Sequence, residues 1–350
     1  MAVGFSIQTG PDDPPSSPTR VRVSQRLGET ATYRVRYPVE VVDGDLAVLR
    51  ADALQPGEDL HVICRGDDEV VSLIKGPING QHVHMEHGAT NAWVDVYGED
   101  TTGEMNRRVR HEAHDGSVQS VLNSILNRYF EVVQVGDVSV ENPGLDRPLV
   151  QTGTDLRFVR RVSRQNGMWL HARSGPEGVN TARVEPMGLD GSTGAELVIN
   201  YDDNNLEALD LYWDVDRPAE VVGRQVSLED KRVFDTGTSP GSWPSKGTNL
   251  EQLAGNRRSS LVAAVDHRGA LKARAEAMLE QAGWFIRARC TTTLHRLGEV
   301  VQVHDLVRLR GMGSRHDGRY FVTAVDHQID AEHHRMEIEL SRNRWDTEAA

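Results

Sequence analysis

The residues best suited to chemistry lie in one short run, His82-Val83-His84-Met85-Glu86-His87. In an extended strand, alternate side chains point to the same side, so positions 82, 84 and 86 would present two imidazoles and a carboxylate together. Imidazole and carboxylate groups are common ligands of transition metals. The run therefore gives a candidate metal site of His82, His84 and either Glu86 or His87, with a polar strand face as the other interpretation.

The spacing of this run departs from the known metal motif that it most resembles. Gly76, five further residues and His82-Val83-His84 are similar to the start of the cupin motif, in which a glutamate follows three or four residues after the second histidine. Here Glu86 follows after one residue, and the second cupin motif has no match. We therefore predict no cofactor and no metal, and keep a metal-dependent cupin-like enzyme or small-ligand binder as the alternative function.

No other pattern in the chain indicates catalysis. Nucleophile elbows, phosphate-binding loops, glycine-rich dinucleotide loops and zincin motifs are all missing from the sequence. His267 and His327 are isolated, and His333-His334 lies in a polar turn, so we interpret them as ordinary hydrogen-bonding residues. We predict that the protein is not an enzyme.

Composition excludes several classes of partner. The 350 residues include 39 Lys and Arg against 52 Asp and Glu, a formal net charge of −13 that repels phosphate backbones and anionic lipid. We predict no specific nucleic-acid binding and, because no apolar run approaches ~18 residues, no stable membrane insertion. Cys64 and Cys290 are too few for a disulfide framework, which fits synthesis in a reducing cytoplasm.

Hydrophobic periodicity predicts strands, then helices, then strands again. Runs of period two separated by turn residues extend from residue 19 to residue 115, and period-two runs return after residue 194. Three-and-four spacing predicts helices beginning near residue 117, over 154–166 and over 266–281. Later strands are expected over 169–172, 196–199, 207–213, 285–294, 300–310, 320–329 and 336–340.

This order predicts an α+β protein that is mostly β, with two tube-like β-barrel domains flanking an α/β domain. The expected parts are a flexible arm (1–18), the first barrel (19–115), the α/β domain (116–194), the second barrel (195–230 and 284–345) with a loop-and-helix insertion (231–283), and a tail (346–350). The arm and the Gly/Ser/Pro-rich tract 235–247 are too polar to form cores of their own, so we expect both to be mobile in the free chain.

Two segments resemble one known family. The first runs Thr154-Asp155-Leu156-Arg157-Phe158-Val159-Arg160-Arg161-Val162 and continues to Gly167 and Trp169; the second is Gly318-Arg319-Tyr320-Phe321-Val322 with His327, followed by Met336 to Asn343. Both are similar to motifs of the phage late control gene D and VgrG family, in the same order. The resemblance covers roughly residues 21–344.

The resemblance implies a structural role as the central hub of a baseplate in a phage tail or a related contractile injection system. The hub would be a homotrimer that adapts the hexameric inner tube to a trimeric spike, with tube, spike and baseplate wedge proteins as its partners. Many VgrG members continue into a spike, whereas this chain stops six residues after Arg344, so we expect the spike to be a separate protein. The protein would be made in the bacterial cytoplasm and become part of the virion tail or injection particle.

The motif residues are given structural rather than catalytic roles. Phe158 and Val162 would dock the helix on its sheet, and Gly167 would end it. The carboxylate of Asp155, in the first turn, would interact favourably with the positive end of the helix dipole. The arginines of the helix, Arg160, Arg161 and Arg164, would pair with a neighbouring chain or face water.

In the second motif, Gly318 would allow a tight turn, Tyr320 and Val322 would pack in the core, His327 would form structural hydrogen bonds, and Arg342 closes the motif.

Two further expectations follow. A carbohydrate- or cell-surface-binding module would use the exposed loops of the β-rich ends, and is a third functional hypothesis. If three copies form a ring, we expect part of the excess negative charge to line its channel, because a strongly attracting wall would retain polyanionic cargo.

Overall fold

The computed structural model describes residues 4–9, 16–39, 41–42, 45–65, 70–87, 91–137, 149–226, 231–235, 247–255, 257–261, 265 and 268–345. The described part is mostly β, as the sequence predicts. Its amino-terminal third contains β1 (Gly4–Thr9), β2 (Arg20–Arg26), β3 (Thr32–Pro38), β4 (Val41–Val42), β5 (Asp45–Leu46), α1 (Ala47–Arg50), the 3₁₀ helix η1 (Asp52–Leu54), β6 (Asp59–Arg65), β7 (Val70–His84) and β8 (Trp93–Glu99).

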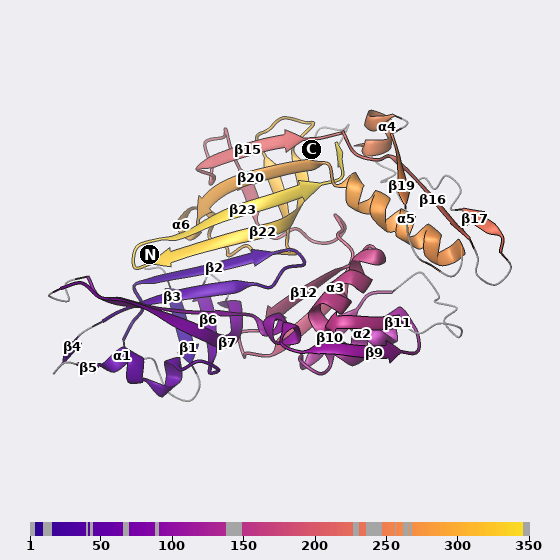
Figure 1. Ribbon diagram of the computed structural model, residues 1–350. Helices are drawn as coiled ribbons and strands as arrows, with labels where there is room; N and C mark the ends of the chain where they lie inside the picture. Colours follow the sequence, from indigo (N-terminus) through magenta and orange to yellow (C-terminus); the bar gives the residue numbers. More distant parts are fainter. Residues whose placement is uncertain are drawn as a thin grey trace.

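One long sheet of 12 strands organises the molecule (Figure 1). Its order is β1-β6-β7-β8-β3-β2-β22-β23-β20-β15, with β21 beside β22 and β14 beside β21. The carboxyl-terminal strands are β14 (Glu196–Val198), β15 (Ala208–Trp213), β20 (Ile286–Thr293), β21 (Leu306–Arg310), β22 (Gly318–Asp330), β23 (His334–Arg342) and β24 (Arg344–Trp345), with the short helix α6 (Leu294–Leu297) after β20.

The join between β2 and β22 unites the two β-rich regions of the sequence. Arg20 lies opposite Asp330 and Arg26 opposite Ala324, in an antiparallel pair of strands about 300 residues apart in the chain. Strands of both regions therefore belong to the same 12-stranded sheet, and no closed barrel of our prediction is detected among the described strands. Alternating polarity showed which face of each strand is buried, but carries no information about which distant strand pairs with it.

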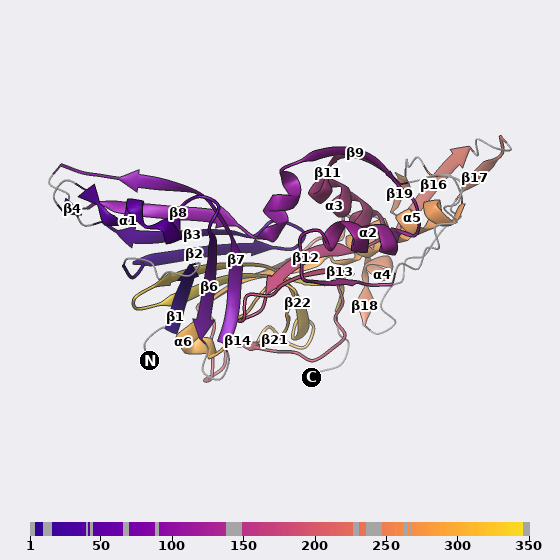
Figure 2. The ribbon, with the colours of Figure 1, turned by 90° about the horizontal axis from the view of Figure 1, so that it is seen from below.

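Each half of the long sheet packs against other strands of the same sheet, which fold back beneath it (Figure 2). In β2, Val21 and Val23 are buried while Arg20 and Arg22 are exposed, so one face of the sheet faces a core. The first core lies between β2, β3 and β8 and the layer of β1, β6 and the first half of β7. The second core lies between β20, β22 and β23 and the pair β14 and β21.

A third core holds the α/β part of the chain together. Here α2 (Val118–Leu126) and α3 (Asp155–Gln165) pack on the sheet β10-β13-β12, beside the two-stranded antiparallel sheet of β9 and β11. The strands of this part are β9 (Val109–His114), β10 (Val132–Val135), β11 (Leu149–Thr154), β12 (Trp169–Ser174) and β13 (Asn180–Glu185). The 3₁₀ helix η2 (Thr101–Asn106) precedes β9 in the chain. Ser117 and Thr154 accept hydrogen bonds from backbone amides at the starts of α2 and α3, as expected of N-cap residues.

The predicted insertion contains a helix packed on a small sheet. The elements are β16 (Glu220–Val226), β17 (Val233–Asp235), β18 (Thr248–Asn249), α4 (Leu250–Ala254), β19 (Arg258–Leu261) and α5 (Arg268–Gly283). Leu279 and Ala275 of α5 are buried against Val221 of β16. The expected helix over 266–281 is thus confirmed with a shift of two residues at each end, whereas residues 236–246 of the tract 235–247 lie outside the described residues.

Two local predictions were wrong. The expected flexible arm contains β1, which pairs with β6 and packs Phe5 and Ile7 on the first core, a long-range contact that the polar sequence after it concealed. The expected strand over 300–310 begins only at Leu306. Before it the chain turns, because Asp305 accepts a hydrogen bond from the amide of Gln302 and His304 adopts a left-handed conformation.

Candidate functional site

The candidate metal residues lie at the end of β7, against an aromatic ring of β8. His82 and His84 share one face of the strand as predicted, and their rings lie 5.0 and 5.1 Å from the ring of Trp93. The Nε2 atom of His84 is 3.3 Å from Glu86 Oε1, and Asn91 donates to the other carboxylate oxygen. No group of three potential metal ligands forms among the described residues, which include His87.

Asp155, from the first family-like motif, is the centre of a buried polar network. It accepts hydrogen bonds from Gln151 at 2.7 Å and from the Tyr129 hydroxyl at 2.8 Å, and lies 3.2 Å from Arg110 and 3.5 Å from Arg128. Burial alone would raise the pKa of Asp155, but these hydrogen bonds and charges outweigh it and hold the pKa below its ordinary value. The network fixes the start of α3 to β9, β11 and the chain after α2.

The arginines of α3 make contacts within their own chain. Arg160 donates to the Thr30 hydroxyl at 2.9 Å, and Arg161 donates to the carbonyl of Val150 at 2.9 Å. Arg164 lies 5.0 Å from the ring of Trp169. Our expectation of pairing with another chain or facing water omitted this third outcome, because sequence spacing does not show which loops reach a helix surface.

The apolar residues and the glycine of the same motif lie as expected. Phe158 and Val162 are buried in the third core, where they dock α3 on its sheet. Gly167 follows α3 with a φ of +74°, and a Cβ there would come within 2.8 Å of the Glu280 carboxylate and 3.6 Å of Ala277 on α5. Gly167 therefore ends α3 in a left-handed conformation and lies at its contact with α5.

The second motif fastens the turn between β21 and β22. Tyr320 is fully buried and its hydroxyl donates to the carbonyl of His316 at 2.8 Å. Arg342, only 1% exposed, donates to the carbonyl of Asp317 at 2.9 Å. Gly318 has a φ of +133° at the start of β22, and Val322 is buried in the second core.

His327 lies in a buried histidine pair. Its Nδ1 is 3.0 Å from Nε2 of His334 on the neighbouring strand β23. Burial lowers the pKa of His334 to about 4 and lowers that of His327 well below its ordinary value, with the neighbouring imidazole adding to the effect. At neutral pH both rings are uncharged and one donates to the other, which agrees with the structural role expected of His327.

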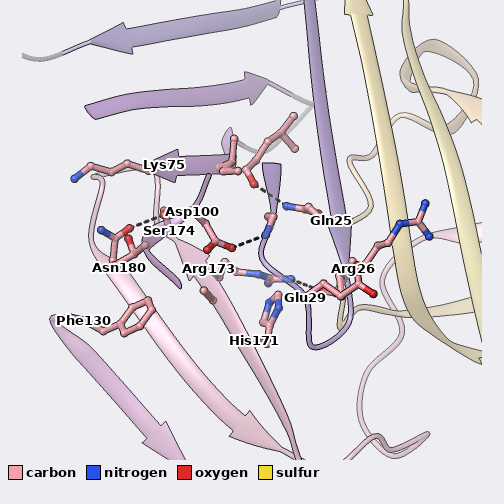
Figure 3. Close-up of a pocket in the computed structure, with 16 residues that line it drawn as sticks. Gln25, Arg26, Glu29, Lys75, Asp100, Phe130, His171, Arg173, Ser174 and Asn180 are labelled. Carbon is pink, nitrogen blue, oxygen red and sulfur yellow. Dashed lines mark hydrogen bonds between the residues drawn. The ribbon is translucent and has the colours of Figure 1, made fainter. Parts of the chain in front are cut away.

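A small cavity lies where the three cores meet (Figure 3). Asp100 accepts hydrogen bonds from the amides of Ala31 and Thr102, both at 2.8 Å, and burial raises its pKa to about 6. Gln25 donates to the carbonyl of Leu73 at 2.6 Å. The space between the lining side chains is about the size of a water molecule, so it is too small for an organic substrate. We interpret the cavity as a packing gap at the junction of the three cores, and we call this junction the joint.

Contacts beside this cavity connect the α/β part to the carboxyl-terminal sheet. Arg173 of β12 donates to Asp305 at 2.9 Å and to the carbonyl of Val303 at 3.1 Å. His171 stacks on His304 with ring centres 4.6 Å apart, and His304 lies 3.3 Å from Glu185. Burial lowers the pKa of His171 well below its ordinary value, so its ring is neutral in the joint.

Sequence reasoning missed these joint residues. Asp100 followed by Thr101 and Thr102 has the pattern of an N-cap, and it does cap η2 by accepting from the Thr102 amide. That signal could have identified the cap, but not its burial between two cores. Arg173 and Asp305 are 132 residues apart and carry no local signal of their pairing.

The other face of the long sheet is polar and carries charges of both signs; we call it the open face. It is defined by the alternate residues of β8, β3, β2, β22, β23, β20 and β15 that point away from the cores. Its charged residues are Arg20, Arg22, Arg26, Arg34, Arg36, Asp95, Glu99, Asp210, Arg287, Arg289, Asp326, Asp330, Arg335, Glu337 and Glu339.

Ion pairs connect neighbouring strands across this face. Arg36 binds Asp95 through two hydrogen bonds of 2.6 and 2.9 Å. Arg26 lies 2.9 Å from Asp326 and 3.4 Å from Glu339, and further along β23 and β20 Glu337 accepts from Arg289 at 2.9 Å. The open face is thus a lattice of compensated charges and provides no concentrated patch of one sign.

Comparison with known proteins finds similarity in fold. No protein-family model matches the chain, and no curated protein matches its sequence. Among solved structures, a tail protein from Neisseria meningitidis has a TM-score of 0.68 at 17% identity, over 98% of this chain and 97% of that one. The 43 kDa tail protein of prophage MuSo2 from Shewanella oneidensis has a TM-score of 0.69 at 12% identity, over 97% of this chain and 98% of that one.

A third similar structure comes from a secretion system. It is an Escherichia coli protein described as a component of the type VI secretion system with structural similarity to bacteriophage T4 tail proteins. Its TM-score is 0.60 at 10% identity, over 96% of this chain and 76% of that one. At these identities the comparisons establish the fold: the chain is folded like phage tail proteins and a related secretion component over nearly its whole length.

Proposed function

We propose that this protein is a structural component of the baseplate of a phage tail or a phage-derived contractile injection system, and that it acts there as the central hub. The observation that carries the proposal is the fold, which matches that of two tail proteins over almost the full length of both chains. The gene D-like residues add support, because Asp155, Gly167 and Arg342 each fasten a turn or helix end of that fold.

The hub would be a homotrimer that adapts a hexameric inner tube to a trimeric spike and is held by baseplate wedge proteins. An open sheet with one buried and one polar face suits a ring wall. Eight strands, from β7 through β8, β3, β2, β22, β23 and β20 to β15, follow one another along the open face, so three copies would supply 24 strands. A ring of that size leaves a wide aqueous channel.

The structure changes the charge that we expect on the channel wall. If the open face lines the channel, the wall is a balanced lattice of ion pairs rather than the acidic surface that we expected from the net charge. Such a wall would still let polyanionic cargo pass without retaining it, since paired charges attract a polyanion only weakly.

The remaining hypotheses have less support. For the metal-dependent enzyme, no group of three potential ligands comes together among the described residues, although Glu86 lies beside His84. Among the described helices none is long and apolar enough to cross a membrane.

Mass photometry of the purified chain, alone and with its tube and spike proteins, tests the proposal. We expect particles of three times 38.8 kDa, the mass of one chain, and larger complexes that contain the trimer. A chain that stays monomeric with tube and spike present would refute it. Binding of glycans by the isolated monomer would favour a cell-surface-binding module instead.

A further inference from the structure

We infer that a groove at one end of the open face binds an extended, acidic segment of a partner protein. The groove has a volume of about 330 Å³ and lies where the open face meets Trp169 of β12 and Gln281 of α5; we call it the sheet groove. The inference rests on the proposed function only in taking the partner to be another protein of the same assembly.

The sheet groove is long enough for an extended chain. Its floor crosses five neighbouring strands of the long sheet, β2, β22, β23, β20 and β15, from Arg26 on the first to Tyr212 on the last. Because neighbouring strands lie about 4.8 Å apart, the four steps between them give a length of roughly 19 Å, which about six residues of extended chain would span. A compact small molecule would fill only part of this length.

One wall of the groove is apolar. It contains Trp169, Met187 in the chain after β13, and Trp284 just before β20. Trp284 is buried in a small cluster with Leu189 and Phe321, and Met187 packs against this cluster, so the interior of the protein holds the wall in place. Apolar side chains of a bound segment would be covered there.

Two arginines at the β15 end of the groove have no carboxylate partner. Among the described residues neither Arg217 nor Arg287 forms an ion pair, so Arg287 is an exception to the paired charges of the open face. Arg217 donates to the carbonyl of Trp284 at 2.9 Å. Burial and then the charge of Arg287 lower the pKa of Arg217, an effect that Asp214 offsets only in part. The two guanidinium groups therefore lie close enough to repel each other.

The other end of the groove does not attract an anion. Its cation, Arg26, already lies 2.9 Å from Asp326 and 3.4 Å from Glu339, and Glu29 adds a further carboxylate to the lining. A carboxylate of the bound segment would be repelled here and attracted at the β15 end. The charges thus set the direction in which the segment lies.

These features define the chemistry of the partner segment. It would place an aspartate or glutamate side chain against Arg287 and Arg217, because a guanidinium group binds a carboxylate through charge-assisted hydrogen bonds. Apolar side chains beside that acid would pack on Trp169 and Trp284. A bound carboxylate would also remove the repulsion between the two arginines.

Two blocked hexapeptides are the probes, one with glutamate between two leucines and one with glutamine in its place. Fluorine NMR of the chain labelled with 5-fluorotryptophan follows Trp169 and Trp284 in the groove and Trp93 on β8, outside it. We expect the acidic peptide to shift the signals of Trp169 and Trp284 and to leave that of Trp93 unchanged. It should bind roughly tenfold more tightly than the glutamine peptide.

A pair of arginine variants tests the assigned residue. Arg287→Gln should weaken binding of the acidic peptide roughly tenfold and leave binding of the glutamine peptide nearly unchanged. The matched control Arg335→Gln removes the same charge from the open face at the other end of β23, and should bind like wild type. Circular dichroism melts verify that both variants are folded.

Three results would overturn the inference. They are equal binding of the two peptides, no shift of Trp169 or Trp284 at about 10 mM acidic peptide, and binding of hexanoate as tight as that of the acidic peptide, which would indicate a site for a small carboxylate.

Mass photometry with tube and spike proteins separates this inference from the proposed function. Arg287→Gln should form the same trimers as wild type, and loss of the trimer would overturn the inference by showing that the groove is a contact between copies. A wild-type chain that stays monomeric would refute the hub alone, because peptide binding is measured on the chain by itself.

Discussion

At the scale of single residues, deeply buried polar side chains of this protein form hydrogen bonds either to the backbone or between two neutral rings. Arg342 donates to main-chain carbonyls of the turn before β22, and the pair His327 and His334 bridges two central strands. A buried polar group contributes in this way only while its partner and its charge state are kept. These residues are therefore sensitive to substitution and to pH.

Replacing Arg342 should destabilise the protein, because this side chain is buried and holds the turn before β22. We expect Arg342→Ala to lower the free energy of unfolding by about 3 kcal/mol, because it removes the donor to the half-buried carbonyl of Asp317 and opens a cavity. The free energy of unfolding of Arg342→Lys should lie between those of wild type and Arg342→Ala, since lysine keeps the charge but not the planar guanidinium. Urea denaturation measures the loss. The control Arg335→Ala, on an exposed side of the same strand, should change it by less than about 0.5 kcal/mol.

The histidine pair should make the protein less stable in acid. An unfolded histidine takes up a proton below its ordinary pKa of 6.5, whereas folded His334 does so only near pH 4. The stabilising contribution is therefore complete above pH 6.5 and is lost as the pH falls toward 4. Between pH 7 and pH 5 this amounts to about 2 kcal/mol for one such residue.

Comparing His334→Gln with wild type at the two pH values isolates this contribution. The variant should lose about 2 kcal/mol less on acidification, and the exposed control His333→Gln should behave like wild type. Asp100 acts in the opposite sense, because burial raises its pKa to about 6, and it is unchanged in all three proteins. An equal acid loss in His334→Gln and wild type would contradict this account.

At the scale of elements, the packing of α3 against α5 joins the α/β part to the insertion. Gln281 of α5 donates to the carbonyl of Arg164, and Arg274 donates to Gln165 near the end of α3. Gly167 lies directly beyond these contacts with a left-handed backbone. A left-handed backbone position therefore lies directly beside the contact between the two helices.

Three glycine substitutions separate backbone strain from crowding at this position. Gly167→Ala should cost about 1 to 2 kcal/mol, chiefly from the left-handed backbone, because the Glu280 carboxylate that a Cβ would meet ends a flexible side chain and can move aside. Gly313→Ala, with a φ of +82° and open space around it, should cost a similar amount. Gly188→Ala, in open space with an ordinary φ, should be neutral or slightly stabilising. A clearly larger loss at 167 than at 313, measured by urea denaturation, would contradict this account and show that crowding against α5 contributes.

At the scale of the whole molecule, one polar face extends across strands from both ends of the chain. Its charges are arranged in pairs such as Arg26 with Asp326 and Arg289 with Glu337, so that the face as a whole attracts neither sign strongly. The chain as a whole also carries a net charge of −13, which repels phosphate backbones. A protein of this kind should not retain nucleic acid.

Removing the acids of the open face should create an affinity that wild type lacks. The triple variant Asp326→Asn, Glu337→Gln, Glu339→Gln releases Arg26 and Arg289, and we expect it to bind a DNA duplex at about 50 mM salt and to lose most of that binding by roughly 200 mM. Fluorescence anisotropy measures both. Asp202→Asn, Asp203→Asn, Glu177→Gln changes the net charge equally away from the face, and binding by this control would attribute the effect to net charge alone.

The sequence by itself determined the local elements and the chemistry of their surfaces. Apolar spacing, the Thr154 cap and Gly167 were enough to define α3, because helix ends depend on residues within a few positions of one another. Alternation in β2 likewise showed which side chains are buried. The acidic composition argued against nucleic-acid binding, and the family-like motifs predicted a structural role in a baseplate.

Only the tertiary structure decided which distant segments meet. The pairing of β2 with β22, the contact of Asp155 with Arg110 and Arg128, and the hydrogen bond from Arg160 to Thr30 all join residues far apart in the chain. Such pairings depend on the combined burial of many strands and leave no periodic signal in any one of them. For that reason the sequence predicted two barrels where the described strands form one continuous sheet, and it could not show that His82 and His84 lie at the end of β7 beside Trp93.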